Sequence, residues 1–358
     1  MYLMGIESSY RVCDVYNELM TYCTVDRHDI YVQNGKGDGY WSNLDQDSNR
    51  KMLENLGNQP VRDIIRQHYP HLESIIFSAS RVAGLEYLNL KGDEICIDYG
   101  CMWGAISVPL AQRTQAVIGI DQTHESLRFL NQRILESNIH NLHLLNHDVK
   151  ALPVLENKVD VSIVNGVLEW IPETGVVELN NYYGKFKKRR YTNRPDQDQL
   201  SFLRRVHTNL NASGKLYLAI ENRFDIKQFF GAKDPHANIR FTSILPRFLA
   251  NIISKLFLGR PYMNWLYSFR GIKKLLRDAG FSRVELYACF PHYHSPTSII
   301  PYDSSFYRHF DASSIGLKAS HRFRSKLRVY IQTKVYIFLF KVLRLKFFSP
   351  SIIAIAHK

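Results

Sequence analysis

Apolar and polar residues follow two alternating patterns between residues 91 and 290. Short apolar runs ending in a polar residue alternate with longer segments in which apolar residues recur every three or four positions. The runs predict buried strands, and the segments predict amphipathic helices. Strands are predicted at Ile95–Asp98, Gln115–Ile120, Leu142–Leu145, Val159–Asn165, Lys215–Glu221 and Arg283–Phe290, and a terminal strand at Pro350–His357. This alternation indicates an α/β fold with a parallel sheet.

Helical periodicity appears both before and within the alternating region. The predicted helices are Asn49–Leu56, Val61–His68, Leu72–Leu88, Gly104–Arg113, His124–Glu136, Gln199–Leu210 and Phe269–Ala279. Thr123 and Ser268 precede two of them as predicted N-caps, and Gly280 stands where a left-handed C-terminal residue is expected. The residues Ala212-Ser213-Gly214 predict a turn before the fifth strand.

The segment Glu94–Leu110, with sequence EICIDYGCMWGAISVPL, carries the first candidate chemistry. A buried strand ends in Asp98, and a glycine-punctuated turn leads into the helix. A strand, a tight turn and a helix N-terminus present backbone N–H groups to a ligand, so we expect this turn to bind a carboxylate. Glycine suits a turn with positive φ or close ligand approach.

This segment has three possible interpretations: two cofactor-binding motifs and a turn with only a structural role. A dinucleotide fingerprint would read G-x-G-x-x-G with an acid about 20 residues later, whereas here Gly100 and Gly104 read G-x-x-x-G after Asp98. The order resembles the first motif of class I S-adenosylmethionine (SAM) methyltransferases, with Met102 in place of the middle glycine. An NAD(P)-linked oxidoreductase and an ordinary turn of another α/β protein are the alternatives.

Polar residues follow consecutive predicted strands, as a ligand site in an open parallel sheet requires. Asp121 after the second strand can accept both hydrogen bonds of a ribose diol, and Asp148 after the third can accept from an adenine amino group. The resemblance covers about residues 91–222 and implies S-adenosyl-L-methionine as cofactor. It implies cofactor contacts from Asp98, Gly100, Cys101, Gly104, Asp121, Gln122, Asp148, Val149 and Asn165.

The resemblance also implies a domain organisation and a fold class. We expect a Rossmann-like class I methyltransferase sheet, mostly parallel with an antiparallel last strand, carrying an N-terminal helical extension and insertions. Residues 1–90 form the arm and extension, and residues 91–290 form the core with an aromatic and basic insertion at 226–267. Residues 291–349 form a basic amphipathic insertion, and residues 350–358 return to the core.

Further segments resemble a subgroup of bacterial methyltransferases associated with surface-polysaccharide and O-antigen assembly. They are Ala219–Phe224, Lys233–His236, Leu245–Arg247, Leu276–Phe281 and Phe290–Pro296. The resemblance implies O-methylation of a sugar or glycan precursor, for which a base would take the hydroxyl proton.

Glu221 and His236 are the candidate catalytic residues. Structural roles remain open for both: Glu221 can pair with Arg223 or Arg247, and His236 can cap a helix. The pair His292 and His294 suggests a metal, but the sequence shows no third ligand, so we expect no metal.

Net charge and cysteine usage constrain the partners. The 358 residues carry a net charge of +13, which predicts an anionic neighbour such as nucleic acid, an anionic membrane surface or a phosphorylated substrate. The five cysteines show no zinc spacing and favour a reducing compartment. No secretion signal and no run of 18 apolar residues is present, so we expect a cytoplasmic protein, soluble or peripheral at the inner face of the membrane.

Two basic regions supply much of the positive charge. A predicted loop contains Lys185–Arg190, and no acid follows Asp311 while basic and aromatic residues intersperse. Basic residues beside an apolar face describe an interfacial helix on anionic lipid, and Phe248–Leu258 is similar; helices with snorkelling lysines packed on the sheet are the alternative. An RNA or small-molecule methyltransferase and a non-catalytic SAM-fold binding protein are the alternative functions.

Overall fold

The computed structural model describes residues 11–12, 14–21, 23–33, 46–173, 176–181, 184–189, 194–311, 313–316 and 323–358. The chain divides into two compact units. Unit 1 contains Met1–Asn165, Arg204–Tyr217 and His357–Lys358, and unit 2 contains Gly166–Leu203 and Leu218–Ala356. Helix α7 (Pro195–Asn209) and strand β9 (Leu210–Glu221) run through both units.

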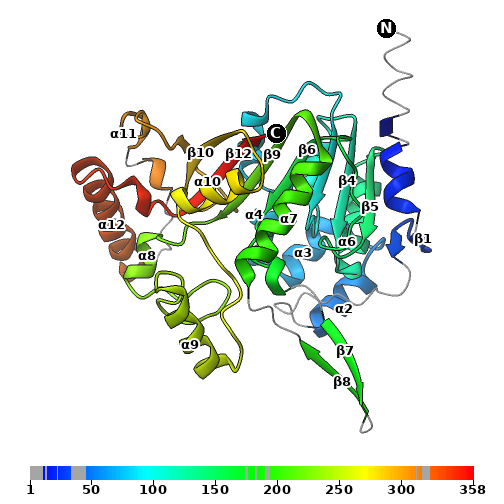
Figure 1. Ribbon diagram of the computed structural model, residues 1–358, viewed down its shortest axis with the longest axis horizontal. Helices are drawn as coiled ribbons and strands as arrows, with labels where there is room; N and C mark the ends of the chain where they lie inside the picture. The colour runs from blue at the N-terminus through cyan, green and yellow to red at the C-terminus, as the bar shows by residue number, and fades with distance from the viewer. Residues whose placement is uncertain are drawn as a thin grey trace. The chain divides into compact units, whose positions relative to one another are not determined.

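The sheet of unit 1 is mostly parallel (Figure 1). Its strands are β1 (Cys23–Val25), β2 (Tyr31–Gln33), β3 (Ile95–Tyr99), β4 (Ala116–Asp121), β5 (Leu142–Asn146) and β6 (Val159–Asn165). Their order is β1-β2-β5-β4-β3-β6, followed by β9. Only β1 pairs antiparallel among the pairings described for β1 to β6. Every residue of β3 and β4 is buried, as the continuous apolar runs of a parallel sheet predict.

The strand order of unit 1 reverses beside β3. After β3 the chain adds β4 and then β5 on one side, and β6 lies on the other side of β3. A crevice opens beyond the carboxyl ends of parallel strands where the order reverses, and ligands bind there. The predicted strands and the Rossmann-like fold class are confirmed, and the fold puts the candidate site at the ends of β3 to β6.

The helices of unit 1 are α2 (Gln46–Glu54), α3 (Val61–His68), α4 (Pro70–Phe77), the 3-10 helix η1 (Ala79–Leu88), α5 (Ser107–Ala111) and α6 (His124–Glu136). The single helix predicted at Leu72–Leu88 is wrong, because Ser78 is extended and its hydroxyl caps η1 at Ser80. The predicted helix Gly104–Arg113 is too long. Gly104 has φ +72°, which a right-handed helix does not allow, so α5 begins three residues later.

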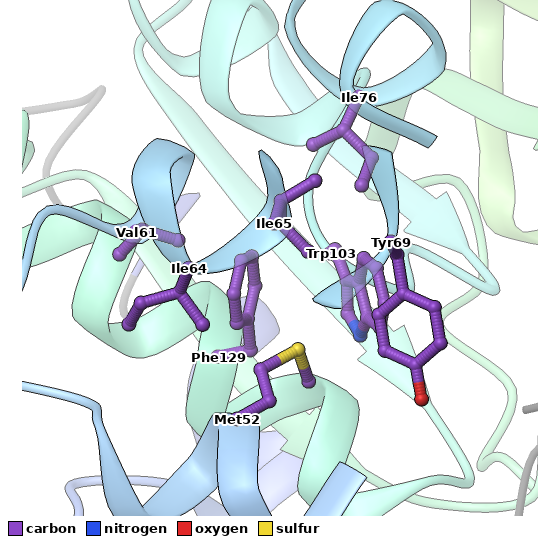
Figure 2. Close-up of a cluster of buried hydrophobic side chains, with 8 residues drawn as sticks. All are labelled: Met52, Val61, Ile64, Ile65, Tyr69, Ile76, Trp103 and Phe129. Atoms are coloured by element: carbon purple, nitrogen blue, oxygen red, sulfur yellow. The ribbon is translucent and has the colours of Figure 1, made fainter. Parts of the chain in front are cut away.

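Four helices of unit 1 share one hydrophobic cluster with the turn after β3. Figure 2 shows the eight buried side chains, which come from α2, α3, α4, the residue between α3 and α4, the turn and α6: Met52, Val61, Ile64, Ile65, Tyr69, Ile76, Trp103 and Phe129. The rings of Trp103 and Phe129 lie 5.0 Å apart. Burying such side chains contributes about 1.5–3 kcal/mol each. The cluster therefore holds the N-terminal helices against the candidate site turn.

The strands of unit 2 end in an antiparallel pair at the edge of the sheet. β12 (Ser351–His357) lies between β9 and β10 (Arg283–Phe290), and β11 (Ser298–Pro301) pairs antiparallel with β10. The last strand therefore lies inside the sheet, and β11 is at its edge. A separate antiparallel hairpin consists of β7 (Val176–Asn181) and β8 (Gly184–Arg189), so the basic region predicted as a loop lies partly in a strand.

The remaining elements of unit 2 are mostly helical. They are η2 (Ile171–Glu173), α8 (Ile226–Phe229), α9 (Arg247–Leu258), α10 (Phe269–Asp278), α11 (Phe306–His309), η3 (Ser313–Ile315), α12 (Phe323–Ile337), the π-helix η4 (Phe338–Val342) and η5 (Lys346–Phe348). The Ser268 hydroxyl accepts from the N–H of Gly271, which confirms the predicted cap. Within the described ranges, no helix combines the length and the apolar character that crossing a membrane requires.

Candidate functional site

The pairing register gathers polar residues into one row at the strand ends of unit 1. Tyr99 pairs with Ile120 and Val164, so the next positions, Gly100, Asp121 and Asn165, stand at one level of the sheet. Asn146 joins this row by pairing with Asp121. Neighbouring strands lie about 4.8 Å apart, and the row is therefore continuous over four strands.

Asp121 is buried at the centre of this row and partly engaged. Its Oδ2 accepts the N–H of Met102 at 2.9 Å, and its Oδ1 accepts the N–H of Thr123 at 2.8 Å. Burial raises the pKa of this carboxyl, although the hydrogen bonds that it accepts lower the pKa. The Thr123 hydroxyl and the Gln122 N–H also act on this carboxyl, so a ligand diol would share its roughly four acceptor sites with these donors.

Asp98 lies beneath the turn, buried, with the hydroxyl of Ser107 donating to its Oδ2 at 2.5 Å. Burial raises the pKa of Asp98 to about 7, although Ser107 and Arg81 oppose the shift. The bond joins the end of β3 to the start of α5, and Asp98 thereby fixes the shape of the turn.

The N–H groups of the turn are largely used within the protein. Those of Gly100 and Cys101 both donate to the carbonyl of Ile120, and that of Gly104 donates to Cys101. The expectation that these three groups hold a ligand carboxylate does not agree with this arrangement. Gly104 has a further reason to be glycine, because a Cβ there would overlap the side chain of Leu130.

Met102 adopts the left-handed backbone that glycine favours, with φ +48°. Its N–H donates to Asp121, and its partly buried side chain packs against the hydrophobic cluster of Figure 2. The side chain that replaces the middle glycine is thus anchored on the N-terminal helices. This position explains how the turn tolerates methionine.

The remaining predicted cofactor residues surround this row at different depths. Gln122 is exposed and Val149 is buried. Asp148 is half-buried, and its Oδ1 accepts the N–H of Lys150 at 2.9 Å. Sequence reasoning missed Asn146, which is buried and donates to the carbonyl of Asp121 at 3.0 Å. Its position one residue beyond the predicted strand Leu142–Leu145 was the available signal.

Unit 2 brings together Glu169, Glu221 and His236. The His236 Nε2 atom lies 3.5 Å from Glu221 Oε2 and 4.0 Å from Glu169 Oε1. The side chain of Glu169 is fully buried, and that of His236 is 5% exposed. Each residue offers one atom to a group whose members all lie within 4.8 Å of one another. The two predicted catalytic residues are therefore neighbours, and Glu169 joins them.

Burial and mutual charge set the protonation of this cluster. Desolvation raises the pKa of Glu169 to about 8, and the Glu221 carboxylate adds to the rise. Desolvation lowers the pKa of His236, but Glu221 outweighs it and raises the value to about 9. Burial disfavours ionisation of Glu221, but His236 and His294 hold its pKa well below its usual range. At neutral pH the cluster thus contains Glu169 protonated, Glu221 ionised and His236 protonated.

The arginines considered as structural partners of Glu221 bind elsewhere. Arg223 donates to the carbonyls of Ser243 and Leu245, and Arg247 donates to that of Leu266. Glu221 Oε1 instead lies 3.4 Å from the hydroxyl of Tyr293 and 3.8 Å from His294 Nε2.

Sequence reasoning missed Glu169 as a site residue. It follows the end of β6 by four residues and β6 belongs to unit 1, while Glu221 ends β9. The candidate residues of the other strands are polar side chains at or just after the strand ends. Glu169 is such a residue only when the connection after β6 is included. His294 was noted in the sequence only as a partner of His292.

Part of the chain is similar to a known methyltransferase domain. Residues 96–182 match the model of a family described as a methyltransferase domain. A Clostridium tetani protein described as an uncharacterized RNA methyltransferase is 32% identical over 85 residues, which are 23% of this chain and 18% of that protein.

Solved structures with a similar arrangement include two methyltransferases. Haemonchus contortus phosphoethanolamine N-methyltransferase 2 is 13% identical with a TM-score of 0.45, over 84% of this chain and 60% of that chain. A SAM-dependent methyltransferase from Aquifex aeolicus is 13% identical with a TM-score of 0.38, over 63% of this chain and 91% of that chain.

The family match covers β4 and β5 completely and contains Asp98, Asp121 and Asn165. It confirms the methyltransferase prediction for this segment. Residues 96–182 therefore carry a methyltransferase domain on a Rossmann-like sheet, and its cofactor is S-adenosyl-L-methionine.

Proposed function

We propose that the whole protein is a SAM-dependent methyltransferase that methylates a hydroxyl oxygen of a sugar or glycan precursor. The observation that carries the methyltransferase part is the continuous row of Gly100, Asp121, Asn146 and Asn165 within the matched domain. We assign the ribose diol to Asp121 and the adenine to the polar groups after β5. The cofactor supplies the methyl group; the protein supplies alignment.

A hydroxyl acceptor requires that a proton be removed. In the transfer, the C–S bond of the sulfonium breaks with its electron pair going to sulfur, and a C–O bond forms as the hydroxyl proton passes to a base. We assign that base to Glu221, which is ionised at neutral pH, and we assign the positioning of Glu221 to its protonated neighbours His236 and Glu169. They are a buried group of titratable side chains 3.5–4.0 Å apart, and such groups commonly mark functional sites.

The class of acceptor rests on weaker but specific observations. The segments Ala219–Phe224 and Lys233–His236 resemble methyltransferases of surface-polysaccharide assembly, and they contain both Glu221 and His236. RNA is the second candidate acceptor, because the Clostridium tetani relative is described as an RNA methyltransferase and the net charge is +13.

The acceptor is tested by incubating the protein with SAM labelled on its methyl group. Parallel reactions contain a glycan-precursor extract or total RNA, and mass spectrometry locates the label. We expect a methyl ether on a glycan. Label on RNA alone would replace the sugar assignment, and no transfer to either extract would contradict both acceptor classes.

The cofactor site is tested separately by calorimetric titration with SAM. Asp121→Ala should weaken binding at least tenfold, because it removes the diol acceptor and the partner of the Met102 N–H. Asp278→Ala, which removes an exposed carboxylate of α10 in unit 2 paired with Lys274, is the control and should bind like the unmodified protein. Equal binding by all three would contradict the assignment of Asp121.

We also propose a peripheral position at an anionic membrane, which would suit a lipid-linked glycan. Helix α9 carries no acid and exposes six large apolar side chains: Phe248, Leu249, Ile252, Leu256, Phe257 and Leu258. Lys255 adjoins this face. Such a combination suits an interfacial helix that buries its apolar side in anionic lipid.

A further inference from the structure

Several buried polar atoms in the cluster of unit 2 form no regular hydrogen bond, although His236 Nε2 and Glu221 Oε2 form an ion pair at 3.5 Å. Among the described residues, nothing hydrogen-bonds to either carboxylate oxygen of Glu169, to Oε2 of Glu221 or to either ring nitrogen of His236. Buried polar groups are almost always paired, and an unpaired one costs about 1–3 kcal/mol. Five such atoms in one place indicate that something else completes the site.

One atom from each of the three side chains lies within 4.8 Å of the other two. Atoms bound to a common ion at about 2.1 Å lie about 3.0–3.5 Å from one another in octahedral or tetrahedral geometry. The His236 Nε2 to Glu221 Oε2 distance of 3.5 Å already agrees with this, and the distance to Glu169 Oε1 is 4.0 Å. Small side-chain adjustments would bring all three ligand atoms to one cation.

Neighbouring groups hold the main chain of His236 and Glu169 and contact the imidazole. The main-chain N–H of His236 donates to Asp234 at 2.9 Å, and the ring edge of Trp170 meets the imidazole with centroids 4.9 Å apart. Asn264, itself buried, donates to the carbonyl of Glu169 at 3.2 Å. These contacts fix where the two side chains leave the main chain.

We propose that Glu169, Glu221 and His236 form a binding site for one divalent first-row transition-metal ion, such as Mn²⁺ or Zn²⁺. Two carboxylates and one imidazole are the donor set that these ions accept, whereas Mg²⁺ and Ca²⁺ prefer oxygen alone. Three protein ligands leave further coordination positions for water or substrate. The histidine pair His292 and His294 does not form this site.

The role of the ion rests on the proposed function. An acceptor hydroxyl bound to the cation would have a lowered pKa. Because Glu221 is then a ligand of the ion, the hydroxyl proton would leave to water in place of Glu221, while the methyl group passes to oxygen and the sulfonium electron pair to sulfur. The binding of the ion, however, requires neither SAM nor acceptor.

The test is a titration of the EDTA-treated, dialysed full chain with Mn²⁺. The electron paramagnetic resonance signal of the free ion measures how much Mn²⁺ stays unbound. We expect one bound equivalent. Glu169→Gln and Glu221→Gln should each raise the dissociation constant at least tenfold. Glu285→Gln, a carboxylate of β10 whose Oε1 lies 3.0 Å from Arg283, is the matched control and should bind like the unmodified chain.

Circular dichroism melting checks that the variants fold, and two separate cluster variants are measured so that a folding defect in one leaves the other as the test. The proposal is overturned when the unmodified chain binds neither Mn²⁺ nor Zn²⁺ at millimolar concentration, or when both cluster variants bind as tightly as the control. Because SAM is absent from the titration, failure of the metal site and failure of the methyltransferase assignment give different results.

Discussion

Met102 shows how a single side chain can serve both a turn and a neighbouring core. Its φ of +48° costs a non-glycine residue about 1–2 kcal/mol. Its side chain packs against the cluster of α2, α3 and α4, which offsets that cost. Because the same N–H donates to Asp121, the residue links the N-terminal helices to the cofactor row of unit 1.

This double role predicts the order of stability of two variants. Met102→Gly and Met102→Ala both lose the packing, but only glycine is free of the left-handed strain. We expect Met102→Gly to be more stable than Met102→Ala by about 1 kcal/mol, measured by urea unfolding. At Ala105 of the same turn, which has no positive φ, substitution by glycine should instead destabilise. An alanine variant as stable as the glycine variant would contradict the strain at Met102.

Candidate site residues could be predicted from the sequence only where a polar side chain stands at the end of a predicted strand. Asp98, Asp121 and Asn165 were found because parallel strands end at one edge. Glu169 could not be found in that way, because its neighbours Glu221 and His236 lie 52 and 67 positions further along the chain. Likewise, no sequence pattern shows that the N–H groups of Gly100 and Cys101 are already donated to Ile120.

At the scale of elements, strands and helices with strong periodicity agreed with the sequence, and segments governed by a single backbone angle did not. α6, α3 and β6 have the predicted bounds. Helix α5 is shortened by the positive φ of Gly104. The turn predicted at Ala212–Gly214 is absent from the described β9, which starts at Leu210, and Gly214 accepts the N–H of Lys358.

Helix α9 supports a prediction about membrane binding. Leu256 is 77% exposed and Phe257 is 74% exposed, and both can enter the lipid interface. The double variant Leu256→Ser, Phe257→Ser should reduce co-sedimentation with vesicles containing phosphatidylglycerol at least tenfold. Binding by the unmodified protein should fall as salt is raised, since screening weakens attraction to the anionic surface.

A matched control distinguishes insertion of α9 into lipid from nonspecific hydrophobic binding. Leu135 on α6 is 66% exposed in unit 1, so Leu135→Ser removes a comparable side chain elsewhere. We expect it to sediment with vesicles like the unmodified protein. Equal loss in the control, or sedimentation with neutral phosphatidylcholine vesicles alone, would contradict a specific anionic-lipid contact of α9.

At the scale of the whole molecule, the two units carry different parts of the proposed chemistry. Unit 1 contains the row around Asp121 within the methyltransferase domain, and unit 2 contains the Glu169, Glu221 and His236 cluster. A ligand that binds only the folded state stabilises the region that holds it. SAM and a divalent ion should therefore protect different peptides from hydrogen exchange.

Hydrogen exchange read by mass spectrometry makes this separation measurable. SAM should slow exchange most in peptides covering residues 99–104 and 121–123, because their backbone shapes the row and its turn. Mn²⁺ should slow exchange most in peptides covering residues 166–171 and 234–238, which hold Glu169 and His236. The Glu169→Gln variant should lose the second effect and keep the first. Protection by SAM confined to peptides of unit 2 would contradict the division of roles, because the ribose acceptor Asp121 belongs to unit 1.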